Sequence, residues 1–141
     1  MSKISIITLS LGLLLTACTN SNTLQQSANE LQLENAKSIH LPDGSIYVGE
    51  LSNNLPNGYG KLTYPNGNRY VGEFNNGTPN GNGELITAEG RYRGTIVNGL
   101  PNGFGITKNN DGSLYEGEHK EGQFDGRGKL TLSDGSYFIG L

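Results

Sequence analysis

From residue 47 onward the chain repeats a short pattern at intervals of 23, 22, 23 and 23 residues. Each unit begins with an aromatic residue and carries glycine two positions later. The unit starts are Tyr47, Tyr70, Tyr92, Tyr115 and Phe138, and the glycines that follow the four tyrosines are Gly49, Gly72, Gly94 and Gly117. A unit this short cannot bury an apolar face alone, so the repeat predicts an array in which each unit packs on its neighbours.

The pattern within a unit predicts a β-hairpin. Its first segment, aromatic-x-Gly-x-apolar, alternates with a period of two, as a half-buried strand does. A Gly-x-Gly pair and a second apolar strand follow, and each unit closes with a turn: Asn66-Gly67, Glu89-Gly90, Asp111-Gly112 or Asp134-Gly135. We interpret Leu55-Pro56-Asn57-Gly58 and its equivalents as a further turn between the two strands. Proline presets φ there, and Asn-Gly supplies a positive φ.

The same alternation assigns side chains to the two faces of the predicted sheet. Tyr47, Gly49 and Leu51 share a face with Gly58, Gly60 and Leu62, and we expect this to be the inner face. Glycine there leaves room for a tyrosine ring to lie flat on the backbone. On the outer face we expect cross-strand contacts Glu50–Lys61 and Glu118–Lys129, each worth at most about a few tenths of a kcal/mol.

This ladder of tyrosines and glycines, over residues 38–141, resembles the MORN repeat family (membrane occupation and recognition nexus). The resemblance implies an all-β fold, an elongated single-layer antiparallel sheet of tandem β-hairpins. It divides the chain into a half unit 38–46, units 47–69, 70–91, 92–114 and 115–137, and a partial unit 138–141. The chain departs from the family pattern because it has no tryptophan, Asn54 replaces a loop glycine, and the fifth position holds Leu51, Phe74, Ile96 or His119.

The N-terminus has the pattern of a secretion signal over residues 1–17. Lys3 supplies a positive head, and an apolar run from Ile4 to Leu15 is too short to span a bilayer. Leu15-Thr16-Ala17-Cys18 resembles the lipobox of bacterial lipoproteins, in which the cysteine becomes lipidated. That resemblance implies a lipid anchor on Cys18 and, with Thr19 following, the periplasmic side of the outer membrane. An ordinary secretory signal with an incidental cysteine is the alternative.

Residues 18–37 would then be a lipidated tether between the anchor and the array. Two interpretations of its polar sequence stay open. One is a flexible spacer, which the Asn, Ser and Gln content favours. The other is a short helix over residues 23–36, with Thr23 and Gln26 as a capping box and a thin apolar stripe.

Composition and residue placement argue against several function classes. The net charge of −3 offers no basic patch for nucleic acid. His40 and His119 fall in different repeats, no serine lies in a Gly-x-Ser-x-Gly elbow, and the Asp-Gly-Ser turns lack the ligand spacing of a calcium loop. We therefore predict no enzyme, cofactor or metal, and we expect His119 to be a partly exposed histidine.

Three functions remain open. The MORN resemblance implies a protein-binding or assembly scaffold with a protein partner. A cell-wall or carbohydrate contact surface is the alternative, and direct lipid binding by the repeats is the weakest, given the acidic charge. The candidate binding rim consists of Tyr59 and Phe104, outward at equivalent positions, with Leu55 and Leu100 beside them. An open sheet edge at the last repeat would allow self-association.

Overall fold

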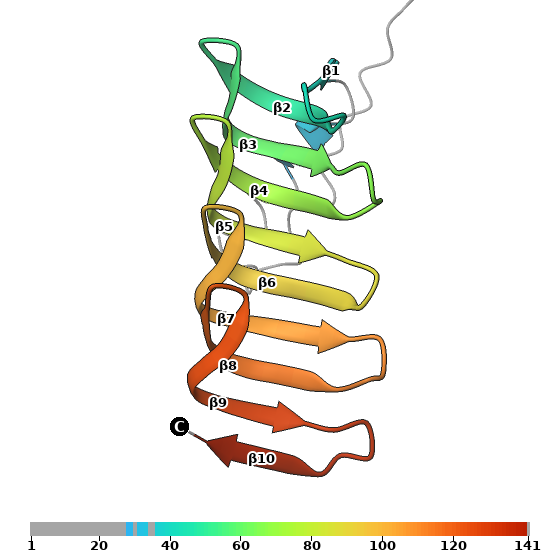
Figure 1. Ribbon diagram of the computed structural model, residues 1–141, viewed down its shortest axis with the longest axis vertical. Helices are drawn as coiled ribbons and strands as arrows, with labels where there is room; N and C mark the ends of the chain where they lie inside the picture. Colours follow the sequence, from blue (N-terminus) through green and yellow to red (C-terminus); the bar gives the residue numbers. More distant parts are fainter. Residues whose placement is uncertain (1–27, 30, 34–35, 141) are drawn as a thin grey trace, which may run out of the picture.

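The structure, a computed structural model, describes residues 28–29, 31–33 and 36–140. Within this part, ten strands form one antiparallel sheet in sequence order, each paired only with its neighbours in the chain (Figure 1). The strands are β1 (Ser38–His40), β2 (Ile46–Ser52), β3 (Leu55–Thr63), β4 (Arg69–Asn75), β5 (Thr78–Ile86), β6 (Gly90–Val97), β7 (Leu100–Asn109), β8 (Leu114–Lys120), β9 (Gln123–Thr131) and β10 (Tyr137–Gly140). The predicted single-layer antiparallel sheet of tandem hairpins is confirmed.

The predicted signal and lipobox lie outside the described residues, as does most of the tether. Of the segment for which a helix was considered, residues 28–29 and 31–33 have helical conformation. The amide of Ala36 then donates a hydrogen bond to the carbonyl of Leu33 at 3.3 Å. A short helical stretch therefore precedes β1.

Two-residue turns connect the two strands of each unit hairpin at one end of the strands, on the left in Figure 1. They are Asn53-Asn54, Asn76-Gly77, Asn98-Gly99 and Glu121-Gly122, and every residue in them has positive φ. Both central residues of a type I′ hairpin turn need this conformation. The turn predicted at Leu55–Gly58 is therefore wrong, because these residues belong to β3, where Pro56 pairs with Leu51.

Proline is tolerated in β3 because the sheet is irregular there. The register of the β2–β3 pair shifts between Gly49 and Leu51, and proline inside a sheet is found at such bulges. The carbonyl of Pro56 accepts a hydrogen bond at 2.7 Å from the amide of Gly77, in the turn of the next hairpin. Pro79 and Pro101 accept equivalent bonds from Gly99 and Gly122. Each proline therefore links its hairpin to the following one.

Longer loops connect the strands at the opposite end, five in the described sheet, and three of the four unit turns predicted from sequence form in them. In these the carboxylate or amide oxygen of the first turn residue accepts a backbone hydrogen bond two residues on, as in Asp111 Oδ1 with Ser113 N at 2.8 Å. Asn66 and Asp134 make the same Asx turn. The second unit differs, because Gly90 already begins β6 and the turn is made by Ala88 and Glu89.

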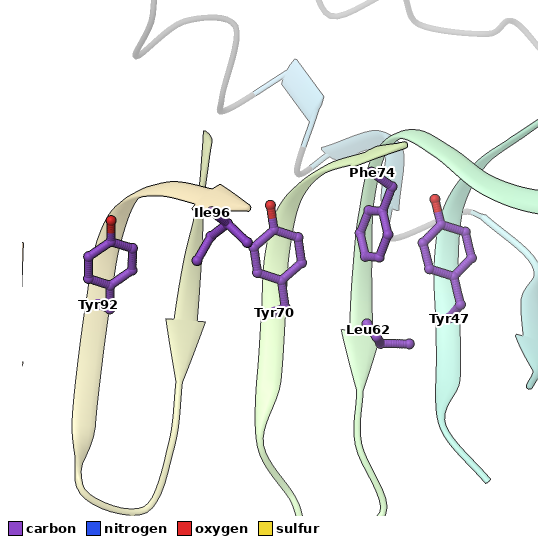
Figure 2. Close-up of a cluster of buried hydrophobic side chains, with 6 residues drawn as sticks. All are labelled: Tyr47, Leu62, Tyr70, Phe74, Tyr92 and Ile96. Atoms are coloured by element: carbon purple, nitrogen blue, oxygen red, sulfur yellow. The ribbon is translucent and has the colours of Figure 1, made fainter. Parts of the chain in front are cut away.

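The core lies where the strands bend. In each of the four unit hairpins the register shifts directly after a cross-strand pair of glycines, such as Gly49 opposite Gly60. From this point to the two-residue turn, the strands curve away from the rest of the sheet (Figure 1). Buried side chains fill the inside of this bend over the first three units (Figure 2): Tyr47, Leu62, Tyr70, Phe74, Tyr92 and Ile96. A single-layer sheet therefore buries a core because the turn end of each hairpin bends over the tyrosine rings.

Candidate interaction surface

The repeat tyrosines form a ladder along the inside of the bend. All four are buried, and each hydroxyl donates to the carbonyl three residues further on. The O···O distances are 2.6 Å for Tyr47, 2.9 Å for Tyr70, 2.8 Å for Tyr92 and 3.0 Å for Tyr115. Burial, with the nearby Glu50, raises the pKa of Tyr47 to about 12, so its hydroxyl remains a donor at neutral pH.

Paired glycines make room for these rings. Gly49 lies opposite Gly60 in the β2–β3 pair, and the same pairing recurs in the other three units. A β-carbon on Gly60 would lie 2.4 Å from Cε2 of Tyr47, closer than any side chain can approach. The prediction that glycine lets the ring lie on the backbone is confirmed. The tyrosines are thereby used by the fold and are not offered to a partner.

The fifth residue of a unit fills the gap between two tyrosine rings. Phe74 meets Tyr47 and Tyr70 edge-on, with ring centroids 5.0 and 5.2 Å apart (Figure 2). Ile96 is fully buried in the equivalent place. Leu51, in the first unit, has no tyrosine of a preceding unit beside it and is 47% exposed, although it has the same place in its unit as Phe74.

His119 occupies the same kind of gap, between Tyr92 and Tyr115. Its ring lies edge-on to both, at centroid distances of 4.8 and 5.1 Å. Nδ1 donates to the carbonyl of Gly117 at 3.1 Å, and Nε2, 2.9 Å from Thr107 Oγ1, accepts from that hydroxyl. The expectation of a partly exposed histidine is wrong, because the register buries position five. Burial lowers the pKa of His119, and this effect outweighs the hydrogen bonds to the backbone of Gly117 and Gly103, which raise it.

The outward glutamates bind backbone rather than lysine. Glu118 Oε2 accepts from the amide of Arg127 at 3.3 Å, and Glu73 accepts from the amide of Asn82. The register of the β2–β3 pair places Lys61 opposite Val48, so it does not lie opposite Glu50. Within the described residues, the predicted pairs Glu50–Lys61 and Glu118–Lys129 do not form ion pairs. The signal available in the sequence was the glutamate eight residues before a glycine in three of the four units.

These glutamates also correct the face assigned to Gly58. A β-carbon there would meet the carboxylate of Glu50, and Gly81 and Gly126 face Glu73 and Glu118 in the same way. All three glycines have positive φ, at 93°, 118° and 69° in chain order. Gly58 therefore marks the bulge on the glutamate side and does not lie under the tyrosine ring.

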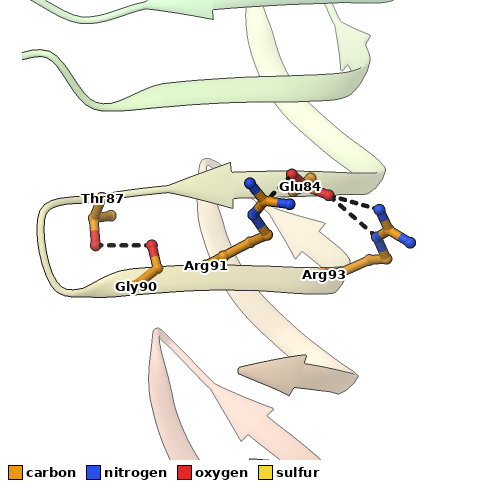
Figure 3. Close-up of polar contacts among 5 residues, drawn as sticks. All are labelled: Glu84, Thr87, Gly90, Arg91 and Arg93. Atoms are coloured by element: carbon orange, nitrogen blue, oxygen red, sulfur yellow. Dashed lines mark hydrogen bonds and ion pairs between the residues drawn. The ribbon is translucent and has the colours of Figure 1, made fainter. Parts of the chain in front are cut away.

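The outer face combines charge with exposed apolar side chains on β7 and, at Tyr137 and Ile139, on β10. On β5 and β6, Glu84 holds Arg91 at 3.2 Å and Arg93 at 2.8 Å (Figure 3). Phe104 follows on β7 with 65% of its surface exposed, and Ile106, two residues further along that strand, is also exposed. We call Phe104 and Ile106 the β7 patch. Its cross-strand neighbours are Arg93, Glu116 and Glu118, so charged residues flank it on both sides.

The remaining rim residues lie elsewhere. Tyr59 corresponds to Phe104 by repeat position, but it is half-buried and borders a hollow of about 200 Å³ with Gln32, Leu33 and Ala36 of the N-terminal segment. Leu55 and Leu100 are exposed and lie directly after the two-residue turns, at the starts of β3 and β7. Leu55 Cδ2 would be 3.7 Å from a β-carbon on Gly77. Only Phe104 therefore lies on an open outer surface, and sequence reasoning missed its neighbour Ile106.

Metal and membrane features can be stated for residues 28–29, 31–33 and 36–140. No group of three His, Cys, Asp or Glu side chains in that part is placed to hold a metal ion. No helix there has the length and apolarity needed to cross a membrane. The turn aspartates Asp111 and Asp134 are instead engaged by serine, whose hydrogen bonds hold the pKa of both carboxyls below the usual range.

Comparison with known families agrees with this geometry. The MORN repeat profile matches residues 47–69, 70–90, 92–114 and 115–137, well over half of the chain. The chain belongs to the MORN repeat family. No curated protein matches the sequence. The MORN repeats indicate a module that contacts proteins or membranes, and the β7 patch lies in the third of the four matched repeats.

Proposed function

We propose that this MORN sheet is a non-catalytic scaffold that binds a protein partner in the bacterial cell envelope. A lipid on Cys18 holds it at the outer membrane, with the array facing the periplasm. The observation that carries the proposal is the β7 patch, an exposed phenylalanine and isoleucine flanked by charged side chains on a regular sheet.

The chemistry of this patch suits a protein. Aromatic anchors surrounded by polar and charged side chains are typical of the residues that carry most of the energy in protein interfaces. β7 is paired with a strand on each side, so Phe104 is presented on a preorganised surface. Less conformational entropy is therefore lost when a partner binds. Because the tyrosine hydroxyls bond within the fold, the inner face has less to offer a ligand.

A photoreactive residue at position 104, in cells, tests the protein partner. Asn82 is the matched control, because it occupies the same outward position one repeat earlier and is also exposed. We expect one dominant protein adduct from position 104, absent from position 82 and lost with Ile106→Asp. Muropeptide adducts would support the cell-wall alternative, and lipid adducts the membrane one. Absence of any protein adduct at position 104 contradicts the scaffold.

The lipid anchor on Cys18 is tested separately with the variant Cys18→Ser. Two or more acyl chains hold a protein stably at a bilayer, whereas removal of the acceptor thiol leaves none. We expect the variant to leave the membrane fraction while the wild type sediments with it. A variant that still sediments, and resists high-salt washing, would mean that the lipobox assignment is wrong. Binding of the variant to protein-free vesicles would point to lipid contact by the repeats.

A further inference from the structure

The N-terminal helical stretch lies against the outer face of the first unit. Asn29, Leu33 and Ala36 line one side of the hollow of about 200 Å³ beside Tyr59. They are spaced four and three residues apart, which places them along one stripe of a helix. Leu31 lies off this stripe and is 66% exposed. The outward aromatic residue of the first unit therefore already faces one stripe of a short helix.

The sheet side of this hollow recurs in the third unit. In the first unit it consists of a glycine and the residue after it on β2, with an aromatic residue on β3: Gly49, Glu50 and Tyr59. The corresponding residues on β6 and β7 are Gly94, Thr95 and Phe104. The second and fourth units have Asn82 and Arg127 in place of the aromatic residue. Units one and three therefore share an aromatic position that the other two lack.

The site in the third unit is open and more apolar. Phe104 is 65% exposed, whereas Tyr59 is half-buried. Ile106, two residues after Phe104, is also exposed, and its counterpart in the first unit is Lys61. A helix laid on the third unit would therefore meet a larger apolar surface than the N-terminal stretch meets on the first.

We propose that the third unit is an open copy of this helix site, and that it binds a short amphipathic helix of the protein partner. An apolar stripe of that helix, with residues spaced four and three apart, packs on Phe104 and Ile106. Laying the apolar face of a helix on exposed apolar surface is a recurrent mode of peptide recognition. The inference deepens the proposed scaffold function and rests on it, because it names the element by which the partner binds.

The charges around the β7 patch indicate basic residues beside the apolar stripe. Glu116 and Glu118 lie on β8, directly opposite the two residues of the patch, and neither forms an ion pair within the described residues. The ammonium of Lys129, the residue opposite Glu116 on β9, instead lies 4.8 Å from a ring centroid on β10. On the β6 side, Arg93 is paired with Glu84 at 2.8 Å. Lysine or arginine on the bound helix would complement the two carboxylates.

The segment that occupies the first unit supplies a probe for the third. The probe is a synthetic peptide of residues 23–37, with a hydrocarbon staple between positions 27 and 31 because a helix this short is marginal in water. Both positions lie off the stripe that contains Leu33. The same stapled peptide with Leu33→Asp is the matched control, and circular dichroism verifies that both are helical. Titrated into the full-length chain, the probe should bind with a Kd below about 1 mM, and the control at least about tenfold more weakly.

Variants of the sheet locate the bound peptide. Ile106→Asp should weaken binding at least about tenfold, whereas Asn82→Asp, at the outward position one repeat earlier, should leave it unchanged. Both side chains are exposed, so neither change should disturb the fold. Replacing Glu30 and Glu34 of the peptide with lysine should strengthen binding at least about threefold at low salt. Glu116→Gln in the chain should reduce that gain.

Four outcomes would overturn the proposal. These are equal binding of the Leu33→Asp peptide, binding that Ile106→Asp leaves unchanged, no binding up to about 1 mM, and a photo-adduct at position 104 that comes from residues 28–36 of a second copy. A protein adduct at position 104 without peptide binding would remove the helix site and leave the scaffold standing. Peptide binding without any protein adduct in cells would support the helix site and contradict the scaffold, so the two failures are told apart.

Discussion

At the scale of single residues, this fold depends on glycines that lie under tyrosine rings. A β-carbon on Gly83 would lie 2.4 Å from Tyr70 Cε2, so Gly83→Ala displaces the ring and its hydrogen bond to the carbonyl of Glu73. We expect a loss of about 1–3 kcal/mol in the free energy of unfolding, as for other overpacked sites. Thermal unfolding followed by circular dichroism would measure it.

Gly140→Ala is the matched control for that substitution, since nothing lies within 4 Å of its added β-carbon. We expect its free energy of unfolding to stay within about 0.5 kcal/mol of the wild type, as at most surface positions. Equal losses for the two variants would contradict the packing of rings on glycine.

The buried His119 predicts a dependence of stability on pH. Burial lowers the pKa of this imidazole in the folded state, so below about pH 6.5 the unfolded chain binds the proton more readily. The stabilisation is thus complete above that pH and declines as the pH falls. His119→Phe, which copies Phe74, should remove this part of the dependence. Urea midpoints at neutral and mildly acidic pH measure it, with His40→Gln as control; an unchanged dependence in His119→Phe would contradict the assignment.

At the scale of one hairpin, the turn residues control stability through their φ angles. Asn54 has φ 63° where the other three units have glycine. Asn54→Ala should lower the free energy of unfolding by about 1 kcal/mol, because alanine tolerates the left-handed region poorly. Asn54→Gly should keep or slightly raise it. Chemical denaturation of both variants checks the contrast, and an alanine variant as stable as the glycine one would exclude a type I′ turn here.

The same hairpin shows how far sequence reasoning reached. Period-two alternation predicted both strands, and the tyrosine–glycine spacing predicted the ring on the backbone. Two segments, Asn53-Asn54 and Asn57-Gly58, had turn chemistry, and the wrong one was chosen. The choice is decided by a bulge at Gly49 and by the bond from Gly77 to Pro56, which joins different hairpins. The burial of His119 depends in the same way on rings from two units.

The candidate site was predicted less well than the fold. Repeat position alone made Tyr59 and Phe104 equivalent, but the N-terminal segment borders Tyr59 and leaves Phe104 open. The glutamates were predicted to face lysines, yet they bind amides at the bulge. The N-terminal segment lies outside the repeat, so the repeat pattern carries no information about its contact with Tyr59. The register shift, in contrast, recurs in all four units, and the glutamate eight residues before a glycine marks it in three of them. Period-two alternation missed it because that alternation assumes an unbroken register.

At the scale of the whole molecule, stability is shared between neighbours along a row of hairpins. Each strand contacts mainly the next, so the free energy of opening should be lowest at the ends and highest in the middle. Hydrogen exchange should therefore be slowest in β4–β7 and fastest in β10, whose residues are all exposed. Uniform protection along the array would show instead that it opens as a single unit.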